Sequence, residues 1–153
     1  MDGHLYDMVL RDCPGVSFFP SDTLSEWAEF HGYGLHSSQV YVLVFDVTKT
    51  DTFNYVKSMR DQIMKTKGDD VMMIIVGSKQ DMADHRMATF RSHFTQMAKK
   101  WKCPLIICSA KYNWNIMNIF KEILKTIEAE IDSKKEIGNR NNARWRLDQC
   151  KIS

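Results

Sequence analysis

Two short polar motifs contain the residues best suited to chemistry, and each stands directly behind an apolar run. The stretch Ser78–Asp81 (Ser-Lys-Gln-Asp) follows VMMIIVG, and Ser109–Lys111 (Ser-Ala-Lys) follows PLIIC. The carboxylate of Asp81 can accept hydrogen bonds from two adjacent N–H groups, which guanine offers at N1 and N2. Adenine offers an acceptor and a C–H there, and a site whose polar group is left unpaired rejects such a ligand strongly. The residue types therefore predict a guanine-binding site that excludes adenine.

The other residues of these motifs fit around a purine base. The backbone N–H of Ala110 is expected to meet guanine O6, and the small side chain allows close approach. The methylene stems of Lys79 and Lys111 are expected to cover the two faces of the ring. Ser78 and Ser109, which open the motifs, complete the predicted guanine-binding set. Such motifs also occur as polar turns and are weak signals singly, but their order and their place behind apolar runs favour the base site.

Four apolar runs rich in branched residues predict buried strands, and helical material follows each of them. The runs are Leu5–Leu10, Val40–Val47, Val71–Val76 and Leu105–Cys108. Strands that alternate with helices imply right-handed crossovers and an α/β fold with a doubly wound, mostly parallel sheet. Ligands of such sheets bind at the carboxyl ends of the strands, which is where both motifs stand.

Apolar residues at helical spacing predict four helices. The first is expected to begin at a capping box made by Thr23 and Glu26. The second is expected to be capped by Asp51 or Thr52 and to end at Gly68. Their apolar residues run through Leu24–Ala28, Phe53–Ile63, Phe90–Trp101 and Ile116–Ile131, and we assign the last three stripes to the core.

The composition limits the classes of protein to which the chain can belong. At 153 residues, with 44% hydrophobic and 26% charged residues, it fits one soluble globular domain. The net charge of +2 argues against a general nucleic-acid binder, because such proteins carry a strongly basic surface. No apolar run approaches the roughly eighteen residues of a membrane-spanning helix. A single cytoplasmic domain is the simplest interpretation.

The four cysteines do not point to a metal or disulfide framework. They form no C-x-x-C pair, so reduced thiols are expected. A zinc or redox site at Cys103 and Cys108 is a poor alternative, because no further Cys/His cluster completes four ligands.

The last twenty residues differ in character from the rest of the chain. Residues 134–153 hold six basic and two acidic side chains, a net charge of +4, and show no apolar period. We expect a mobile basic tail. Cys150-Lys151-Ile152-Ser153 fits a C-a-a-X prenylation box loosely, since Lys151 is not aliphatic, and a terminal Ser would favour farnesyl. Lipid at Cys150 together with the basic tail would hold the protein at the inner leaflet of the plasma membrane; the alternative is a solvated tail with a chance cysteine.

The motifs resemble those of the Ras superfamily of small GTPases. Ser78–Asp81 is similar to the superfamily's N/T-K-x-D, Ser109–Lys111 to its S-A-K, and Asp12–Gly15 (Asp-Cys-Pro-Gly) to its D-x-x-G. The stretches LSEWAEF, VYVLVFDVTKTDTF and CSAKYNWN look like the Ras-like family 10 branch, and the resemblance spans about residues 3–131. It implies that residues 1–133 form a partial G domain of the P-loop NTPase type. It also implies a GTP/GDP-binding switch in signal transduction, with effector and regulator proteins as partners.

The resemblance also assigns roles on the phosphate side. It implies that Asp12 holds Mg²⁺ through water and that the N–H of Gly15 contacts the γ-phosphate. A strand-end Asp followed by Pro-Gly is equally an ordinary turn. Val16 stands where many relatives place the glutamine that orients water, so slow or absent hydrolysis is expected. Ser78 replaces the usual Asn or Thr, and its shorter side chain is expected to weaken affinity more than specificity.

One part of the superfamily's pattern is missing. No G-x-x-x-x-G-K-[ST] occurs among the seven glycines, and the chain opens at what resembles the hairpin turn before the family's third strand. A G domain without its first strand, phosphate loop and first helix should have two unpaired strand edges, which must close up or leave the fold unstable. High-affinity GTP binding is not expected of these residues alone. The alternative function is a non-catalytic pseudo-GTPase or truncated isoform that acts as a membrane-tethered interaction module through the helix around Trp27.

Overall fold

The structure is a computed structural model and describes residues 7–30, 32–84 and 88–149. Five helical segments, one of them a short 3-10 helix, alternate with three strands along the described chain. In order they are α1 (Thr23–Phe30), β1 (Val40–Asp46), α2 (Thr50–Lys67), β2 (Met72–Ser78), η1 (Gln80–Met82), α3 (Ala88–Trp101), β3 (Leu105–Ile107) and α4 (Ile116–Gln149).

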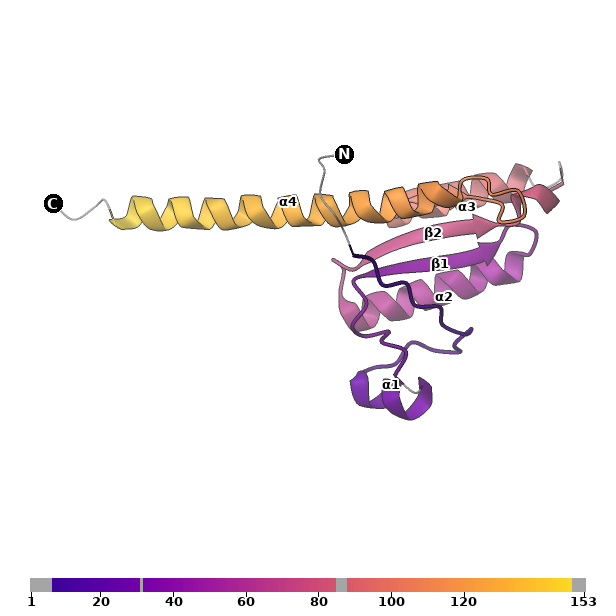
Figure 1. The fold of residues 1–153 in the computed structure, drawn as a ribbon, viewed down its shortest axis with the longest axis horizontal. Helices are drawn as coiled ribbons and strands as arrows, with labels where there is room; N and C mark the ends of the chain where they lie inside the picture. Colours follow the sequence, from indigo (N-terminus) through magenta and orange to yellow (C-terminus); the bar gives the residue numbers. More distant parts are fainter. Residues whose placement is uncertain (1–6, 31, 85–87, 150–153) are drawn as a thin grey trace.

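The strands form one parallel sheet in the order β1-β2-β3, with β2 in the centre (Figure 1). Val40 pairs with Met72 and Asp46 with Ser78, so β1 and β2 begin and end together. The shorter β3 pairs with the second half of β2. Three of the four predicted strands are therefore confirmed, and their carboxyl ends meet at one edge of the sheet.

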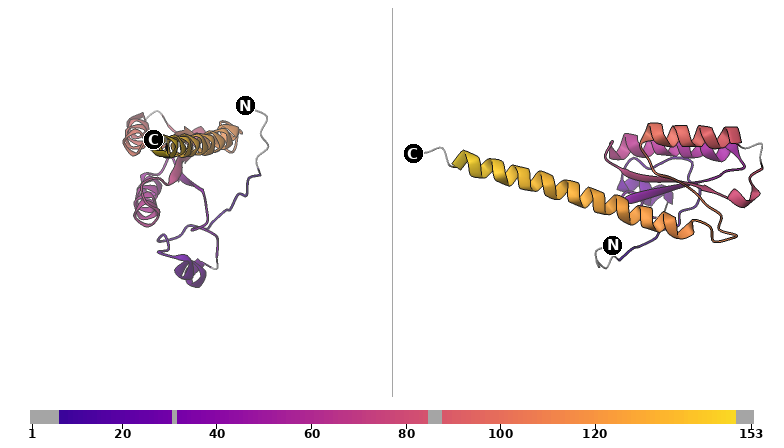
Figure 2. Two further views of the ribbon diagram at one scale, coloured as in Figure 1. Left: turned by 90° about the vertical axis from the view of Figure 1, so that its left-hand side faces the viewer. Right: turned by 90° about the horizontal axis from the view of Figure 1, so that it is seen from above.

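Helices cover both faces of the sheet (Figure 2). α2 and α3 lie on one face, where Phe45, Phe53 and Phe94 belong to one buried cluster. α4 lies on the other face, where Ile123 packs with Ile74 of β2. Parallel strands buried on both faces need apolar side chains on both sides, which explains the unbroken apolar runs in the sequence. The α/β fold with a doubly covered parallel sheet is confirmed, as a partial domain of its type.

The prediction of a strand at Leu5–Leu10 is wrong for the part that the structure describes. Residues 5 and 6 lie outside the described residues, and residues 7–10 belong to no strand. Val9 and Leu10 are 76% and 69% exposed. An apolar run becomes a buried strand only when a neighbouring strand pairs with it, and no described strand pairs with residues 7–10.

A cleft separates this extended segment from β1. It has a volume of about 430 Å³, is flanked by residues 7–11 on one side and by Val40 and Val42 on the other, and is lined on α4 by Ile123, Leu124 and Ile127. The segment and the edge of β1 therefore do not close upon each other. β1 keeps one edge unpaired among the described strands.

The first helix begins as predicted, but with a different cap. The N–H of Ser25 donates to Oδ1 of Asp22 at 2.8 Å, and the N–H of Asp22 donates to Oγ of Ser25 at 3.1 Å. This reciprocal pair is a capping box one residue earlier than the Thr23–Glu26 pair expected from the sequence. Asp22 is the N-cap because its carboxylate is a better acceptor at that position than a threonine hydroxyl.

Glu26 does not serve as the predicted cap and instead binds the loop before β1. Its residue is only 3% exposed, and its carboxylate accepts the N–H of Leu35 at 2.6 Å and that of His36 at 2.9 Å. Burial acts to raise the pKa of Glu26, but the backbone N–H donors outweigh it and lower that pKa. Glu26, which the sequence pattern assigns to a helix cap, therefore fixes the turn before β1.

Replacing Glu26 by Ala should destabilise the protein by about 2–3 kcal/mol, because two partly buried N–H groups lose a charged acceptor. The free energy of unfolding from urea titration measures this loss. Glu29→Ala on the exposed side of the same helix is the matched control and should change stability by less than about 0.5 kcal/mol. Equal losses in the two variants would contradict the anchoring role.

α2 ends as predicted and starts without the predicted cap. Gly68 follows its last residue with φ of 90° and donates its N–H to the carbonyl of Met64 at 2.9 Å. The N-cap is Lys49, with no side-chain cap. Thr52 instead accepts the N–H of Asp46 at 3.0 Å through Oγ1. The predicted cap residue thus ties the helix to the end of β1.

α4 is longer than predicted. The sequence places its end near Ser133 and a mobile tail behind it, whereas the helix continues to Gln149 and extends well beyond the sheet (Figure 1). Residues 134–149 contain no proline, and a helix already anchored on the sheet continues through them without a new nucleation step. The division into domains at residue 133 stays a prediction, and Cys150 lies outside the described residues. Within the described part, no helix is both apolar and long enough to span a bilayer.

Candidate functional site

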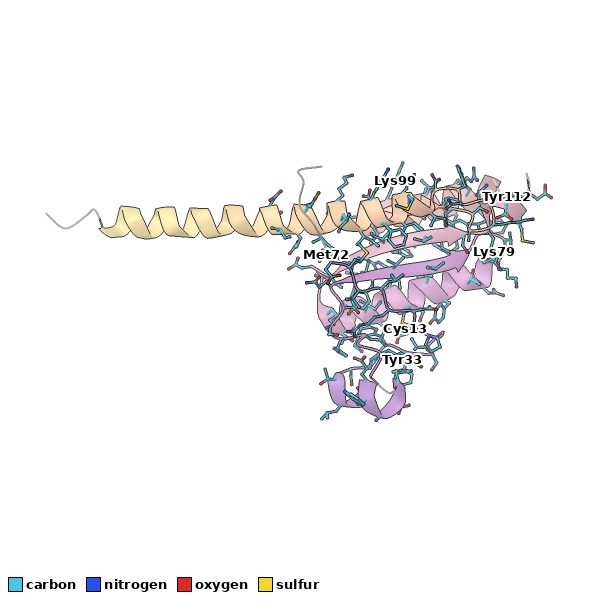
Figure 3. The ribbon with its side chains drawn as sticks, in the orientation of Figure 1. Cys13, Tyr33, Met72, Lys79, Lys99 and Tyr112 are labelled. Atoms are coloured by element: carbon cyan, nitrogen blue, oxygen red, sulfur yellow. The ribbon has the colours of Figure 1, made fainter. Side chains whose placement is uncertain are left out.

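Both polar motifs lie at the edge of the sheet where the parallel strands end. Ser78 is the last residue of β2, and its Oγ donates to the carbonyl of Phe45 in β1 at 3.1 Å. Lys79 follows in the left-handed conformation, with φ of 62°. Few residues other than glycine adopt this conformation, and here it turns the chain out of the strand and into η1. Figure 3 shows Lys79 and Tyr112 at this same end of the molecule, opposite Met72.

Hydrogen bonds join the two motifs into one site. Oγ of Ser109 donates to Oδ1 of Asp81 at 2.6 Å. The N–H of Gln80 donates to the carbonyl of Cys108 at 3.1 Å, which fixes the first motif against the end of β3. Ser109 is 2% exposed, whereas Asp81 lies at the surface. The structure therefore places the Asp81 carboxylate at the surface and holds it through the hydroxyl of the buried Ser109.

The second motif forms a tight turn that presents its backbone outward. Ser109 and Trp114 exchange two backbone hydrogen bonds, at 3.1 and 2.9 Å, which close the turn. Ala110 and Lys111 lie exposed at its start. The N–H of Ala110 has no acceptor among the described residues. Nζ of Lys111 lies 5.1 Å from the ring centroid of Tyr112, a cation–π contact. The N–H predicted to meet guanine O6 therefore belongs to an exposed residue.

Sequence reasoning missed one residue of the site, Asp46 at the end of β1. Its Oδ2 lies 2.7 Å from Nζ of Lys79, and its Oδ1 accepts both the N–H and the hydroxyl of Thr48, at 2.9 and 2.6 Å. Asp46 is 8% exposed, whereas the Lys79 side chain is 54% exposed. The sequence does contain a sign of the turn: Asp46 ends an apolar run and precedes Thr48 by two residues, and an Asp so placed often accepts hydrogen bonds from the residue two positions on. Asp46 positions the lysine that the motif supplies.

The charge of Asp46 is firmly maintained. Burial acts to raise the pKa of Asp46, but hydrogen bonds from Lys79 and Thr48 outweigh it and bring the pKa to about 2, from the usual 3.8. A carboxylate whose pKa is lower in the folded than in the unfolded chain stabilises the fold above the unfolded value. That contribution is lost as the pH falls from 3.8 to about 2.

An Asp46→Asn variant should therefore be less stable than the wild type near neutral pH, and the difference should shrink as the pH falls from 3.8 towards about 2. Urea unfolding at several pH values measures both stabilities. Asp70→Asn is the control, since Asp70 is exposed in the turn before β2 and should leave the pH profile unchanged. A gap between wild type and Asp46→Asn that stays constant over that pH window would contradict the account.

The phosphate-side residues are not joined to this site by any contact in the described chain. Asp12 and Gly15 are exposed, and a side chain built at Gly15 would meet nothing within 4 Å. In Figure 3 Cys13 lies with Tyr33 on the α1 side of the molecule, apart from Lys79 and Tyr112. No group of three His, Cys, Asp or Glu suited to a metal occurs in the described residues. Asp12 alone does not make a Mg²⁺ site, and its predicted role through water stays a prediction.

Val16 is partly buried at the side of a hydrophobic cluster. Its side chain packs against the buried cluster that contains Phe19 and Met59, and its carbonyl accepts the hydroxyl of Tyr55 of α2 at 2.7 Å. An apolar side chain so held offers no hydrogen bond to a water molecule. The expectation of slow or absent hydrolysis stays a prediction.

The described thiols have the character of packing residues. Burial raises the pKa of Cys108, and burial raises that of Cys103 although Arg60 acts in the opposite direction. Because the thiolate is the reactive and metal-binding form, a raised pKa makes both cysteines poor nucleophiles and poor ligands.

A parallel sheet with helices on both faces and polar loops at its carboxyl ends is a frequent architecture of nucleotide-binding domains. The profile of the Ras family matches residues 25–129, more than half of the chain. The chain therefore belongs to the Ras family, as its motifs predict.

Known relatives place it more closely. The chain is 41% identical over 130 residues to the human Ras-like protein family member 10B, covering 83% of this chain and 64% of that protein. It is 33% identical over 132 residues to the mouse Ras-like protein family member 10A, covering 82% and 64%. The GTP-binding protein Rheb homolog of Dictyostelium discoideum is 29% identical over 126 residues, covering 82% and 63%. The chain thus spans slightly less than two thirds of the length of these relatives.

Proposed function

We propose that this chain is the base-recognition part of a Ras-like molecular switch that binds GTP and GDP in signal transduction. One observation carries the proposal: the Asp81 carboxylate lies at the surface and is anchored at 2.6 Å by the buried Ser109, whose chain neighbour Ala110 is exposed. Guanine needs these two features together, an acceptor for N1–H and N2–H and a donor for O6.

The residues present fit a guanine base. Oδ1 of Asp81 uses one of its lone pairs for Ser109, and a carboxylate oxygen has a second. Both carboxylate oxygens are therefore able to accept from the two guanine donors while the serine contact persists. Lys79, held by Asp46, would cover one face of the ring with its methylene stem. Mg²⁺ would need oxygens beyond Asp12, so no step is derived through it.

Hydrolysis by this chain is proposed to be slow or absent. Val16 packs into the core where a water-orienting glutamine would be needed, and no G-x-x-x-x-G-K-[ST] cradle occurs in the sequence. Binding through the base alone is correspondingly weak, because the phosphates contribute much of the affinity in sites of this kind.

A thermal shift series tests the proposal. GDP at about ten times its Kd should stabilise the fold by roughly 1.4 kcal/mol and raise Tm by about 3–5 °C. ADP at the same concentration should leave Tm unchanged. Equal shifts with GDP and ADP would reject base recognition. Stoichiometric GDP or GTP released by heating the purified chain would overturn the expectation of weak binding.

A second candidate is a non-catalytic interaction module, and the exposed face of α1 favours it. Leu24 and Trp27 are 81% and 69% exposed and lie three residues apart, so they share one side of the helix. Large apolar side chains on a surface often mark a protein contact. Proximity labelling in cells should lose a defined partner set with Leu24→Asp and Trp27→Asp combined. An unchanged set would reject this candidate.

We further propose that the protein resides at the cytoplasmic face of the plasma membrane. The support is sequence chemistry: Cys150 in a C-a-a-X-like context and a net charge of +4 over residues 134–153. A single prenyl chain binds reversibly and needs such a second, electrostatic signal. Cys150→Ser should move the protein from the membrane to the cytosolic fraction, with Cys13→Ser as the control. An unchanged distribution of Cys150→Ser between the two fractions would contradict the lipidation proposal.

A further inference from the structure

A groove between α3 and the outer edge of β3 has no role in the site described above. Its volume is about 420 Å³. β3 pairs with β2 on one side, and on its other side no described strand follows. The residues of the groove that matter here come from three segments and are Arg91, Lys99, Leu105, Ile107, Trp114 and Asn115.

The edge of β3 presents backbone groups to this groove. On the inner side, Pro104 accepts the N–H of Ile75 at 2.9 Å and Cys108 donates its N–H to Gly77 at 2.8 Å. Peptide groups alternate sides along a strand, so those of Leu105 and Ile107 point outward. Nδ2 of Asn115 already donates to the carbonyl of Ile107 at 2.9 Å. Two N–H groups and the carbonyl of Leu105 therefore remain for a ligand, and an extended peptide supplies matching groups.

The rim of the groove is basic without compensating acid. Arg91 and Lys99 lie two helical turns apart on α3, are exposed, and form no ion pair with any described residue. The sequence from residue 85 to residue 121 holds seven Lys and Arg side chains and no Asp or Glu. Trp114, 48% exposed, adds an apolar wall. Unbalanced charge of one sign beside an open groove favours a ligand of the opposite sign.

We propose that this groove binds an extended acidic peptide segment of a partner protein. The peptide adds its backbone to the free edge of β3 and places carboxylates against Arg91 and Lys99. Charge complementarity selects the acidic sequence, and the outward N–H groups of Leu105 and Ile107 select the extended conformation. A lipid surface would meet the exposed cations but has no means of pairing with a strand edge between them.

Backbone amide NMR of the full chain tests the proposal with a capped eight-residue peptide that alternates Glu and Val. The amides of Leu105 and Ile107 are expected to shift on titration, and a Lys-Val peptide of equal length should leave them unchanged. Arg91→Glu combined with Lys99→Glu should weaken binding by roughly tenfold or more. The matched control, Lys57→Glu with Lys65→Glu on the exposed side of α2, changes the net charge equally and should leave binding intact.

Four results would overturn the proposal: no shift of the Leu105 and Ile107 amides at millimolar peptide, equal shifts with the Lys-Val peptide, equal losses in the two charge-reversed variants, or shifts of these amides with anionic phosphatidylserine vesicles but not with the peptide. Circular dichroism checks that both variants fold. Asp81 and Ser109 do not line the groove, so a failure of the peptide to bind would not count against the proposed guanine site.

Discussion

An Asp81→Asn variant should bind GDP about 100-fold more weakly than the wild type and should prefer xanthosine diphosphate. The carboxylate of Asp81 only accepts hydrogen bonds, so it matches the two adjacent donors of guanine. Xanthine keeps N1–H but carries a carbonyl at position 2. An asparagine amide, with one acceptor and one donor group, matches that pattern. The expected loss for guanine corresponds to a charge-assisted hydrogen bond replaced by an unpaired contact, about 2–3 kcal/mol.

Ser109 makes this substitution a clean test. Its hydroxyl donates to Oδ1 of Asp81 at 2.6 Å, and the amide oxygen of asparagine accepts the same bond. The fold of the loop should therefore persist, which heat unfolding of the variant checks. Asp70→Asn, in the turn before β2, serves as the matched control. Equal loss of GDP and xanthosine diphosphate binding would contradict base recognition by residue 81.

Replacing Phe53 by Ala should cost about 3–5 kcal/mol of stability, the largest loss expected of a single truncation in this core. Phe53 is 1% exposed, and its ring centroid lies 4.6 Å from that of Phe94, 5.1 Å from that of Phe45 and 5.8 Å from that of Trp101. It joins α2, α3 and β1, so no small shift of one element fills the space left. A loss of this size is a large part of the 5–15 kcal/mol typical of a domain.

Urea unfolding of Phe53→Ala measures this cost. Phe53→Leu should lose less, because most of the volume remains. Met117→Ala is the exposed control, since Met117 is 62% exposed and should change stability by less than about 0.5 kcal/mol. A loss below about 1 kcal/mol for Phe53→Ala would show that the aromatic cluster is not the centre of the fold.

Local patterns predicted the elements that the structure buries. β1, β2 and β3 stand within one or two residues of the predicted runs, because a strand covered on both faces must be apolar throughout. α2 and α3 follow their apolar stripes for the same reason. Leu5–Leu10 has the same composition as these strands, and yet its described part is exposed. An apolar composition shows that a segment can form a strand. Whether it does so depends on a neighbouring strand, and the sequence of the segment holds no information about that neighbour.

The place of the two motifs at one sheet edge could be predicted from the sequence, but the contacts that support them from within could not. The order of Asp81, Ser109 and Ala110 along the chain placed them at one sheet edge, and the structure brings Asp81 and Ser109 into direct contact. Asp46 was missed because it supports Lys79 from another strand. Contacts between side chains far apart in the sequence depend on the strand register, which fixes Asp46 opposite Ser78 and is not visible in the residues themselves.

Caps and helix ends were the weakest predictions. Thr23 with Glu26 fits the capping pattern, but Asp22 is the better N-cap acceptor and the loop before β1 binds the Glu26 carboxylate. The end of α4 was placed at the last apolar contact. A polar helix without proline can continue past that point, since the anchored turns already provide the nucleus.

Recognition of the guanine base by Asp81 and Ala110 is the central proposal. The most direct measurement is an NMR titration of the isotope-labelled full chain with GMP and AMP, read at the backbone amides of Ser109, Ala110 and Lys111. GMP should shift these amides in the wild type and fail to do so in Asp81→Asn, while AMP should leave them unchanged in both. Shifts of equal size with AMP, or GMP shifts that survive Asp81→Asn, would contradict the account.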